Sequence, residues 1–366
     1  MRVLPCVLLV SLVASPLLVR LGRRPAGASH SSGSPGTPAR IAASPSPVDP
    51  AGDRPQPAAA AARTYPRLPA DPAAIADQLA RLEEELRSEA TPSTLLPDLG
   101  HRQQVIYRRL AADPGLAARV RGFLPPRWQG VLDLHLAARR EFLAMHRGSR
   151  PASVVPAWRI IPPEPADRLL RYYREASAAT GIPWEVLAAV NLVETGMGRI
   201  DGVSMADARG PMQFLPSTWA EPGIGEGDIR DPQAAIHAAA RYLVRRGGLK
   251  DIRRGLWGYN NSDHYARAVL LYARLLRQDP LAFTGLYHWE IHYVSSAGDL
   301  WLPVGYNQPK PLPVAVYLRR FPASAPPPPE APGGGARPLS SKSDPLQSLP
   351  AAVTRDRGPA ARPSPH

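Results

Sequence analysis

Cysteine is nearly absent from this sequence, in which Cys6 is the only one. The chain can therefore form no internal disulfide bond, and a metal site built from cysteine thiolates is excluded. Lysine is almost as rare, occurring only at Lys250, Lys310 and Lys342, so the net charge of +13 comes from arginine. No basic run with interleaved aromatic residues accompanies that charge, so we expect no nucleic-acid partner. The charge suits anionic polymers instead.

Proline, in contrast, is abundant, with 45 residues that cluster toward the two ends of the 366-residue chain. Residues 29–68 and 308–366 are rich in Pro, Ala, Ser and Gly and show no apolar period, so we expect both to be disordered. Ahead of them, the apolar run 3–19 resembles a secretory signal, and residues 1–28 are predicted to be a signal peptide or an uncleaved membrane anchor. Both alternatives predict an exported protein, extracellular or associated with the cell wall.

Helical periodicity dominates the sequence between these two ends. Residues 69–155 are predicted to be a helical hairpin or small bundle, with Asp71 opening the ordered region. This N-terminal region carries no recognisable chemistry, so its expected role is to pack against the helices on its C-terminal side. Within residues 156–307 we expect helices over 167–180, 233–246 and 265–277, and a polar loop over 258–263.

The apolar period changes to strict alternation near residue 287. Residues 287–293 alternate as a β-strand does, and residues 299–304 follow as a second short strand after a turn. This pattern predicts a small β-hairpin near the end of a mainly α protein. His288 and His292 would share a strand face with Glu290. Because no third metal ligand is evident, we expect that face to be solvated.

One carboxylate, Glu194, lies in the most informative stretch of the chain. The helix that carries it is predicted to begin at Pro183 and to end at Gly196. Asn191 and several apolar residues share its helix face, which places the carboxyl low in a hydrophobic wall. Desolvation and the negative end of the helix dipole would both raise its pKa, as a general acid near neutral pH requires. Helix spacing alone leaves open a surface glutamate beside an apolar stripe.

Three clusters in a fixed order give Glu194 its context. They are Glu194-Thr195-Gly196, the stretch 210–219 that begins Gly-Pro-Met-Gln-Phe, and Tyr-Asn-Asn-Ser-Asp-His-Tyr over 259–265. In this order they resemble the soluble lytic transglycosylase superfamily of the lysozyme-like fold, and in particular the branch that includes membrane-bound lytic transglycosylase B and its actinobacterial relatives. The resemblance covers residues 156–306, and more weakly the helices before them, and implies a lysozyme-like (α+β) catalytic domain over residues 156–307 that acts on peptidoglycan glycan strands.

The resemblance also implies residue roles. Glu194 matches the catalytic acid and base. Ser204, nine positions before Gln213, matches a serine that contacts substrate, and Asn260 matches an asparagine that holds the N-acetyl group. The other predicted substrate-binding positions are Thr195, Met212, Gln213, Phe214, Tyr259 and Tyr265. Met212 and Tyr259 could equally be packing residues, and Thr195 replaces a serine that is frequent in other branches.

The implied reaction cleaves the MurNAc–GlcNAc β-1,4 bond and forms a 1,6-anhydro-MurNAc end. A retaining hydrolase would need a second carboxylate, and no acid here has a matching place in the family motif. A lytic transglycosylase needs none, because the substrate's acetamido group stabilises the charge and its own 6-hydroxyl attacks. A hydrolytic lysozyme-type muramidase and a non-catalytic peptidoglycan-binding protein remain the alternatives.

No metal or other cofactor is expected. The acidic stretch 226–231 is too short for an EF-hand and contains an arginine. The expected partners are peptidoglycan glycan strands and, through the basic charge, anionic wall polymers. We expect a monomer that touches a membrane only if its N-terminal segment is an anchor.

Overall fold

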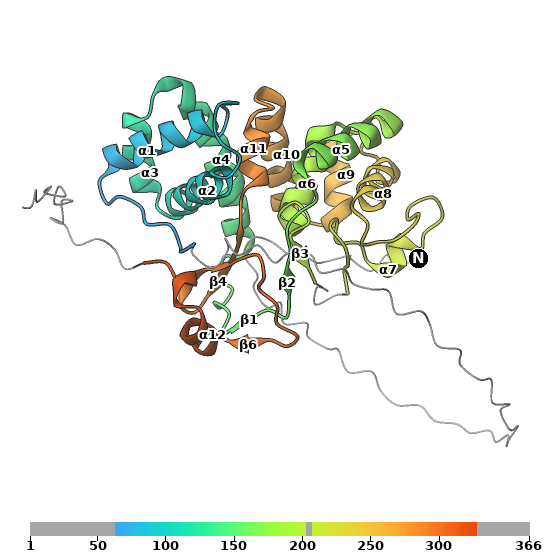
Figure 1. Cartoon of the computed structure of the whole chain (residues 1–366). Coiled ribbons are helices and arrows are strands. Elements are labelled where there is room, and N and C mark those ends of the chain that lie inside the picture. The colour runs from blue at the N-terminus through green and yellow to red at the C-terminus, as the bar shows by residue number, and fades with distance from the viewer. Residues whose placement is uncertain (1–62, 203–206, 328–366) are drawn as a thin grey trace, which may run out of the picture. The chain divides into compact units, whose positions relative to one another are not determined.

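The computed structural model describes residues 63–202 and 207–327 (Figure 1). This part of the chain is mainly helical, with three two-stranded antiparallel sheets. The predicted mainly α fold class is therefore confirmed. The predicted signal peptide or anchor, most of the linker and most of the tail lie outside the described residues. Within residues 63–202 and 207–327, every helix is too short or too polar to cross a bilayer.

Four helices form a small bundle at the N-terminal side: α1 (Pro72–Glu85), α2 (Leu96–Ala112), α3 (Pro114–Phe123) and α4 (Pro126–Met145). Each has proline in its first turn, where the missing N–H would have no helical partner. The carboxylates of Asp71 and Asp113 cap α1 and α3 by accepting backbone N–H groups. These local signals explain why the bundle was recognisable in the sequence.

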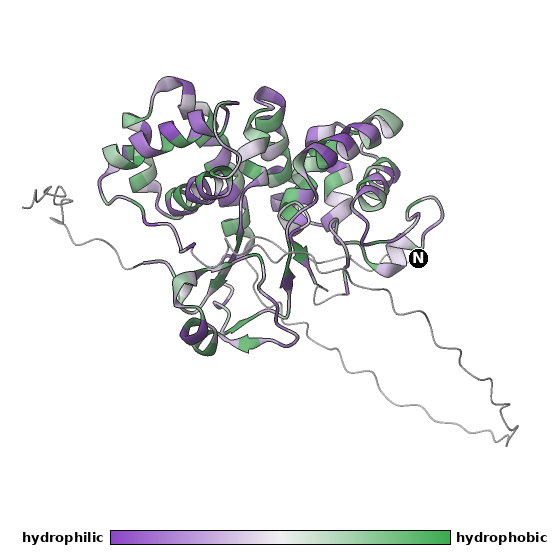
Figure 2. Cartoon of the chain, viewed as in Figure 1, coloured by the Kyte–Doolittle hydropathy of each residue, from purple (hydrophilic) through white to green (hydrophobic). Residues whose placement is uncertain are grey.

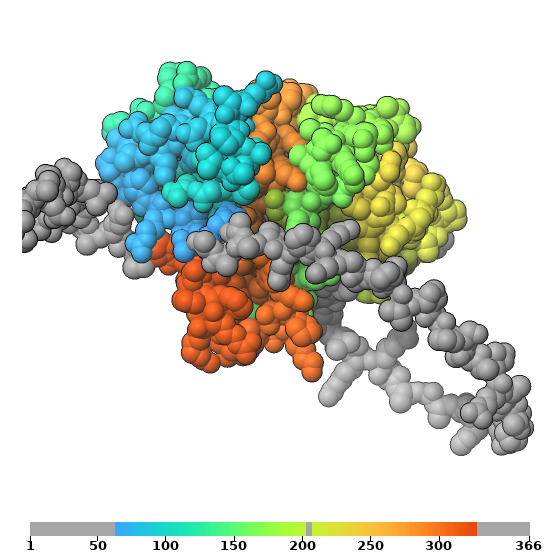
Figure 3. Space-filling model, in the orientation of Figure 1, coloured from blue at the N-terminus to red at the C-terminus, as the bar shows by residue number. Residues whose placement is uncertain are grey.

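The later helices are α5 (Ala166–Thr180), α6 (Trp184–Thr195), α7 (Pro216–Trp219), α8 (Pro232–Arg245), α9 (Ile252–Asn260), α10 (Asp263–Gln278), α11 (Ala282–Tyr287) and α12 (Val314–Arg320). Helix α10 packs against both α4 and α6, and the orange α10–α11 segment lies between the N-terminal helices and α5–α6 (Figure 3). One hydrophobic core runs through both groups of helices. The N-terminal bundle is therefore built onto the second group through α10.

Helix α6 is central, and every residue from Val186 to Thr195 is buried. The sequence predicted one apolar face, whereas α6 is enclosed on all sides by its neighbours. Its neighbour α5 is amphipathic and shows hydrophilic residues along its exposed side (Figure 2). Helix α6 begins at Trp184, one residue later than predicted, and Pro183 is the residue that precedes its first turn. Gly196 ends the helix in the left-handed conformation, as predicted.

The strands are β1 (Val154–Val155), β2 (Arg159–Ile160), β3 (Ile200–Asp201), β4 (Ile291–Ser295), β5 (Gly298–Leu302) and β6 (Leu312–Pro313). They pair as β1–β6, β2–β3 and β4–β5. The β4–β5 pair is the predicted hairpin, with Ile291 opposite Leu302 and Ser295 opposite Gly298. The predicted first strand began too early, because Tyr287 is the last residue of α11.

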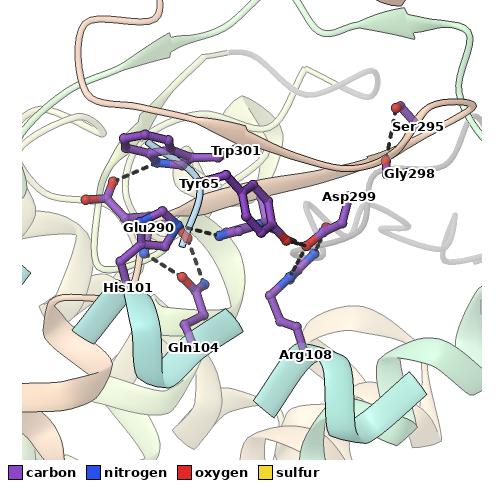
Figure 4. A network of polar contacts seen from close by, with 10 residues as sticks. Tyr65, His101, Gln104, Arg108, Glu290, Ser295, Gly298, Asp299 and Trp301 are labelled. Carbon is purple, nitrogen blue, oxygen red and sulfur yellow. Dashed lines mark hydrogen bonds and ion pairs between the residues drawn. The ribbon is translucent and has the colours of Figure 1, made fainter. Parts of the chain in front are cut away.

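The hairpin face that carries His292 is buried, so the prediction of a solvated face is wrong. His292 is 1% exposed, and its Nε2 atom lies 3.0 Å from Nε2 of His101 in α2. Its Nδ1 atom lies 3.0 Å from the Asp299 carboxylate, which also pairs with Arg108 and accepts the Tyr65 hydroxyl (Figure 4). Helix α2 and the segment before α1 cover this face, which a pattern confined to one strand cannot reveal.

A second set of contacts fastens α2 to the hairpin. The Gln104 side chain donates to the carbonyl of Glu290 at 2.8 Å and accepts its N–H at 2.9 Å, much as a neighbouring strand would (Figure 4). The Glu290 carboxylate pairs with Arg63 at 2.6 Å. The three elements therefore form one connected polar network.

Three predicted boundaries need correction. The chain remains structured past residue 308, because Val314 and Tyr317 of α12 are buried in a small second core. At the other end, Tyr65 is buried within the stretch predicted as linker. The predicted polar loop 258–263 is instead the last turn of α9 and the start of α10. In each case tertiary contacts made by a few side chains order a segment whose composition predicted a linker, tail or loop.

Candidate active site

Glu194 occupies the last turn of α6, and its side chain is almost completely enclosed. The residue is 2% exposed. The hydroxyl of Tyr265, in the first turn of α10, donates to Glu194 Oε1 at 2.7 Å. Gly196 then turns the chain away with φ of +61°, and a Cβ there would lie 2.6 Å from Ile291 Cδ1 of β4. Glycine suits this position because the left-handed conformation strains other residues, and a Cβ would also require the Ile291 side chain to shift.

Burial raises the pKa of Glu194 from 4.5 to about 8, and the hydrogen bond from Tyr265 acts in the opposite direction. The carboxyl is therefore mostly protonated at neutral pH, as a general acid must be. No other charged group contributes to this shift among the residues that the structure describes. The surface alternative for Glu194 is ruled out by its burial, and the raised pKa agrees with the sequence-based expectation.

Tyr265 is fully buried, and burial together with Glu194 raises its pKa well above 10. It therefore stays protonated and remains a hydrogen-bond donor. A donor held against a carboxyl favours the ionised form of that carboxyl. Tyr265 thus supports the state in which Glu194 has lost its proton. The family resemblance implied that Tyr265 binds substrate, and in the structure its hydroxyl donates to Glu194.

The Gly-Pro-Met-Gln stretch forms a tight loop closed by Arg209 and Phe214, whose backbone groups bond each other at 2.8 and 3.0 Å. Gly210 has φ of +72°, and a Cβ there would lie 1.9 Å from the carbonyl oxygen of Ile229. Gln213 also has positive φ, +49°. A residue other than glycine in this conformation is strained, and such strain is concentrated at functional sites.

The end of α6 is tied to this loop by two side chains. The Thr195 hydroxyl donates to the Pro211 carbonyl at 2.6 Å, and the Asn191 amide donates to the same carbonyl at 2.8 Å. Thr195 is fully buried, so its place is in the scaffold rather than on a surface that substrate can contact. Asn191 is a supporting residue that sequence reasoning grouped with Glu194 without a role. Its i, i+4 spacing to Thr195 was the available signal.

Met212, Phe214 and Tyr259 also support the loop. Met212 is fully buried, and its carbonyl accepts the Tyr259 hydroxyl at 2.8 Å. The Phe214 ring packs edge-on against Tyr259, with centroids 5.9 Å apart. For Met212 and Tyr259, the structure therefore favours the packing alternative over direct contact with substrate.

Gln213 and Asn260 retain some access to solvent, with 6% exposure each. Gln213 donates to the Gly210 carbonyl at 3.0 Å, while its side-chain oxygen is buried with no protein hydrogen bond among the described residues. Asn260 lies in the last turn of α9. Ser204 lies outside the described residues. Within residues 63–202 and 207–327, no three His, Cys, Asp or Glu side chains cluster as a metal site requires.

The fold and this site define a mainly helical, lysozyme-like domain centred on one buried glutamic acid. Residues 171–270 match the family model of the transglycosylase SLT domain, and that range includes every candidate side chain placed above. No curated protein and no solved structure matches the chain. The family match supports lytic transglycosylase activity on peptidoglycan.

Proposed function

We propose that this protein is a peptidoglycan lytic transglycosylase that cleaves the MurNAc–GlcNAc β-1,4 bond and leaves a 1,6-anhydro-MurNAc end. Glu194 acts first as general acid and then as general base. The observation that carries the proposal is a buried Glu194 with a pKa near 8 whose carboxylate form has a dedicated donor in Tyr265. We also propose that it belongs to the branch of membrane-bound lytic transglycosylase B and its actinobacterial relatives.

In the first step the proton of Glu194 passes to the oxygen that links the two sugars, and the bond from that oxygen to C1 of MurNAc breaks. The acetamido carbonyl oxygen of the same sugar forms a bond to C1 and takes the positive charge. Gln213 and Asn260 are suited to hold that acetamido group, with Ser204 as a third contact. The Glu194 carboxylate that remains is stabilised by the Tyr265 hydroxyl.

In the second step Glu194 accepts the proton of the 6-hydroxyl, and O6 attacks C1 as the acetamido oxygen leaves. Atoms and charges balance without water. Attack from within the same ring is favoured because the nucleophile is already in place. The pair Glu194 and Tyr265 thus serves both steps, since protonated Glu194 is the acid and its tyrosine-bonded carboxylate is the base.

The same fold could support a hydrolase, which is the first alternative. A retaining hydrolase places a second carboxylate about 5 Å from the acid. In the described part of the chain no second acid influences the pKa of Glu194, which favours the transglycosylase. A wall-binding protein without catalysis is the second alternative, and the buried acid with its tyrosine donor argues against it.

The proposed substrate, peptidoglycan, indicates where in the cell the protein acts. We propose that the protein is exported and works at the cell wall as a monomer, tethered if residues 1–28 are retained as an anchor. Its net charge of +13 suits contact with anionic wall polymers.

The test is mass spectrometry of the products released from purified peptidoglycan by the full chain and by Glu194→Gln. Glu185→Gln, in the first turn of the same helix, is the matched control. Anhydro-muropeptides from the wild type and the control, but not from Glu194→Gln, would support the proposal. Products with reducing ends in place of anhydro ends would show that the enzyme is a hydrolase. Binding without any product would leave the wall-binding alternative.

A further inference from the structure

Arg139, on the buried side of α4, is a cation that has no ion pair within residues 63–202 and 207–327. The residue is only 5% exposed, and its Nε and Nη1 atoms are buried with no hydrogen-bond partner among those residues. Burial and the charge of Arg108 lower the pKa of Arg139 to about 9, so its guanidinium is still charged at neutral pH. An uncompensated buried charge is strongly destabilising. The surroundings of Arg139 therefore call for a negative charge.

The carboxylate nearest in its effect, Asp299 of β5, is already committed to other donors. Asp299 raises the pKa of Arg139, but it pairs with Arg108 through both of its oxygens (Figure 4). It also accepts from the Tyr65 hydroxyl at 2.9 Å and faces His292 Nδ1 at 3.0 Å. Arg108 balances the charge of Asp299. Arg139 thus leaves one positive charge in excess in this buried region.

Tyr272 of α10 contributes a second buried donor to the same region. It is 1% exposed, and in the part of the chain that the structure describes its hydroxyl has no hydrogen-bond partner. Helices α4 and α10 pack against each other, and Arg139 is close enough to Tyr272 to lower its pKa. Burial outweighs that effect and raises the pKa of Tyr272 to about 12, so the hydroxyl keeps its proton. Buried tyrosine hydroxyls usually have a partner, and one acceptor could serve both Tyr272 and Arg139.

The chemistry of these groups selects an anion. The Nε and Nη1 groups of Arg139 can only donate, and a cation would be repelled by Arg139 and Arg108. A water molecule would satisfy hydrogen bonds but would leave the charge uncompensated. A single negative charge satisfies both, because hydrogen bonds to an ion are about twice as strong as those between neutral groups. The burial of Arg139 and Tyr272 restricts the ligand to a small ion.

We propose that Arg139 and Tyr272 bind one small monovalent anion, of the class of chloride, between α4 and α10. Arg139 donates to it through Nε and Nη1, and Tyr272 donates through its hydroxyl. The anion joins the N-terminal bundle to α10, whose first turn carries Tyr265. The site takes no part in the reaction at Glu194, so its test is independent of the proposed function.

The first experiment measures thermal unfolding of the full chain as chloride replaces gluconate at constant ionic strength and pH 7.5. Gluconate has the same charge but is too large for an enclosed site. A ligand that binds only the folded protein raises its stability by mass action, so the unfolding midpoint should rise by roughly 4 °C or more between about 1 mM and about 300 mM chloride. A midpoint that does not respond to chloride would overturn the proposal in favour of buried water.

The second experiment repeats the titration with variants. Arg139→Gln should lose the chloride response, and in gluconate it should be at least as stable as the wild type because the uncompensated charge is gone. Arg140→Gln is the matched control, since it removes the same charge from the next, exposed residue of α4 and should respond as the wild type does. A wild-type response in Arg139→Gln would refute the assignment. Should that variant not fold, Tyr272→Phe decides the matter, because it should need several-fold more chloride for the same stabilisation.

The third experiment locates the ion directly. Crystals of the full chain grown with bromide in place of chloride should show anomalous scattering within hydrogen-bond distance of Arg139 Nη1 and the Tyr272 hydroxyl. A water molecule at that position, or bromide only at the protein surface, would contradict the proposal. Activity is not part of any of these measurements, so a failure of the proposed function would leave their outcome unchanged.

Discussion

The Nε2 atoms of His101 and His292 lie 3.0 Å apart in the buried network that joins α2 to the β4–β5 hairpin. At that distance one nitrogen must donate and the other must accept, so the pair shares a single proton. Arg63 faces His101 Nδ1 at 3.4 Å, and Asp299 faces His292 Nδ1 at 3.0 Å. These partners assign His101 Nε2 as the donor and His292 Nε2 as the acceptor, with both rings neutral.

This arrangement predicts that acid weakens the fold. Burial lowers the pKa of both histidines, and that of His101 lies well below its usual value of 6.5. The unfolded chain takes up protons below pH 6.5 while the folded chain does not. Stability is therefore full above about pH 6.5 and falls with decreasing pH, by at most about 1.4 kcal/mol per pH unit for each histidine, until the pH reaches that histidine's pKa in the folded protein.

The measurement is urea unfolding of the wild type and His101→Gln between pH 7.5 and 5.5. Glutamine can still donate to His292 and accept from Arg63, so the variant should fold. Because the variant lacks the titrating His101 imidazole, we expect its free energy of unfolding to depend less steeply on pH, by the contribution of one histidine. Identical pH dependence in the two proteins would contradict the shared-proton assignment.

Glu194→Gln should make the protein more stable at neutral pH while abolishing activity. The pKa of Glu194 is 4.5 in the unfolded chain and about 8 in the folded protein. Its stabilising contribution is complete below pH 4.5 and is lost as the pH rises toward 8. Between pH 4.5 and pH 7, a span of 2.5 pH units, the wild type loses stability at about 1.4 kcal/mol per unit, or about 3.5 kcal/mol in total.

Glutamine does not ionise, so the free energy of unfolding of the variant does not fall between pH 4.5 and pH 7 for this reason. Thermal unfolding at pH 7 and pH 4.5 checks this, since the advantage of Glu194→Gln should shrink toward the lower pH. Glu185→Gln should show no such difference. A variant less stable than the wild type at pH 7 would show that the carboxyl is not held in the protonated form.

Tyr265→Phe should move the alkaline limb of the activity profile to higher pH. The wild type should lose activity above about pH 8 as Glu194 ionises and can no longer act as acid. The Tyr265 hydrogen bond lowers the pKa of Glu194, so removing it raises that pKa further. The maximal rate should fall by roughly tenfold or more, because the carboxylate needed in the second step loses its donor.

The pH–rate profile separates this effect from simple structural damage. Tyr259→Phe is the control, because the Tyr259 hydroxyl donates to the Met212 carbonyl. It should change the rate without moving the alkaline limb. An unshifted limb in Tyr265→Phe would show that Tyr265 does not tune Glu194.

Gly210→Ala should disrupt the loop that lines the site. Its φ of +72° disfavours alanine, and the added Cβ would meet the Ile229 carbonyl oxygen at 1.9 Å. We expect a loss of at least about 2 kcal/mol in the free energy of unfolding, with activity strongly reduced. Gly122→Ala is the control, since nothing lies within 4 Å of its Cβ position in α3. Alanine there should stabilise the helix by about 0.5–1 kcal/mol, and the opposite ranking of the two variants would contradict this account.

Local signals in the sequence determined a large part of the fold. Asp71, Asp231 and Gly196 mark helix ends through capping and left-handed geometry, which depend on neighbouring residues alone. Apolar spacing revealed the helices in the same way. The order of the glutamate, Gly-Pro-Met-Gln and Tyr-Asn clusters likewise indicated the domain that the family model matches at residues 171–270.

Only the tertiary structure showed which of the candidate site residues contact Glu194 and which support the scaffold. Tyr265, 71 positions after Glu194, brings its hydroxyl to the carboxyl, whereas Thr195, beside it in sequence, is buried in the scaffold. His292 is buried because His101, 191 residues away, packs against it. Burial and pKa depend on which distant side chains exclude water, and spacing along a single helix or strand carries no record of them.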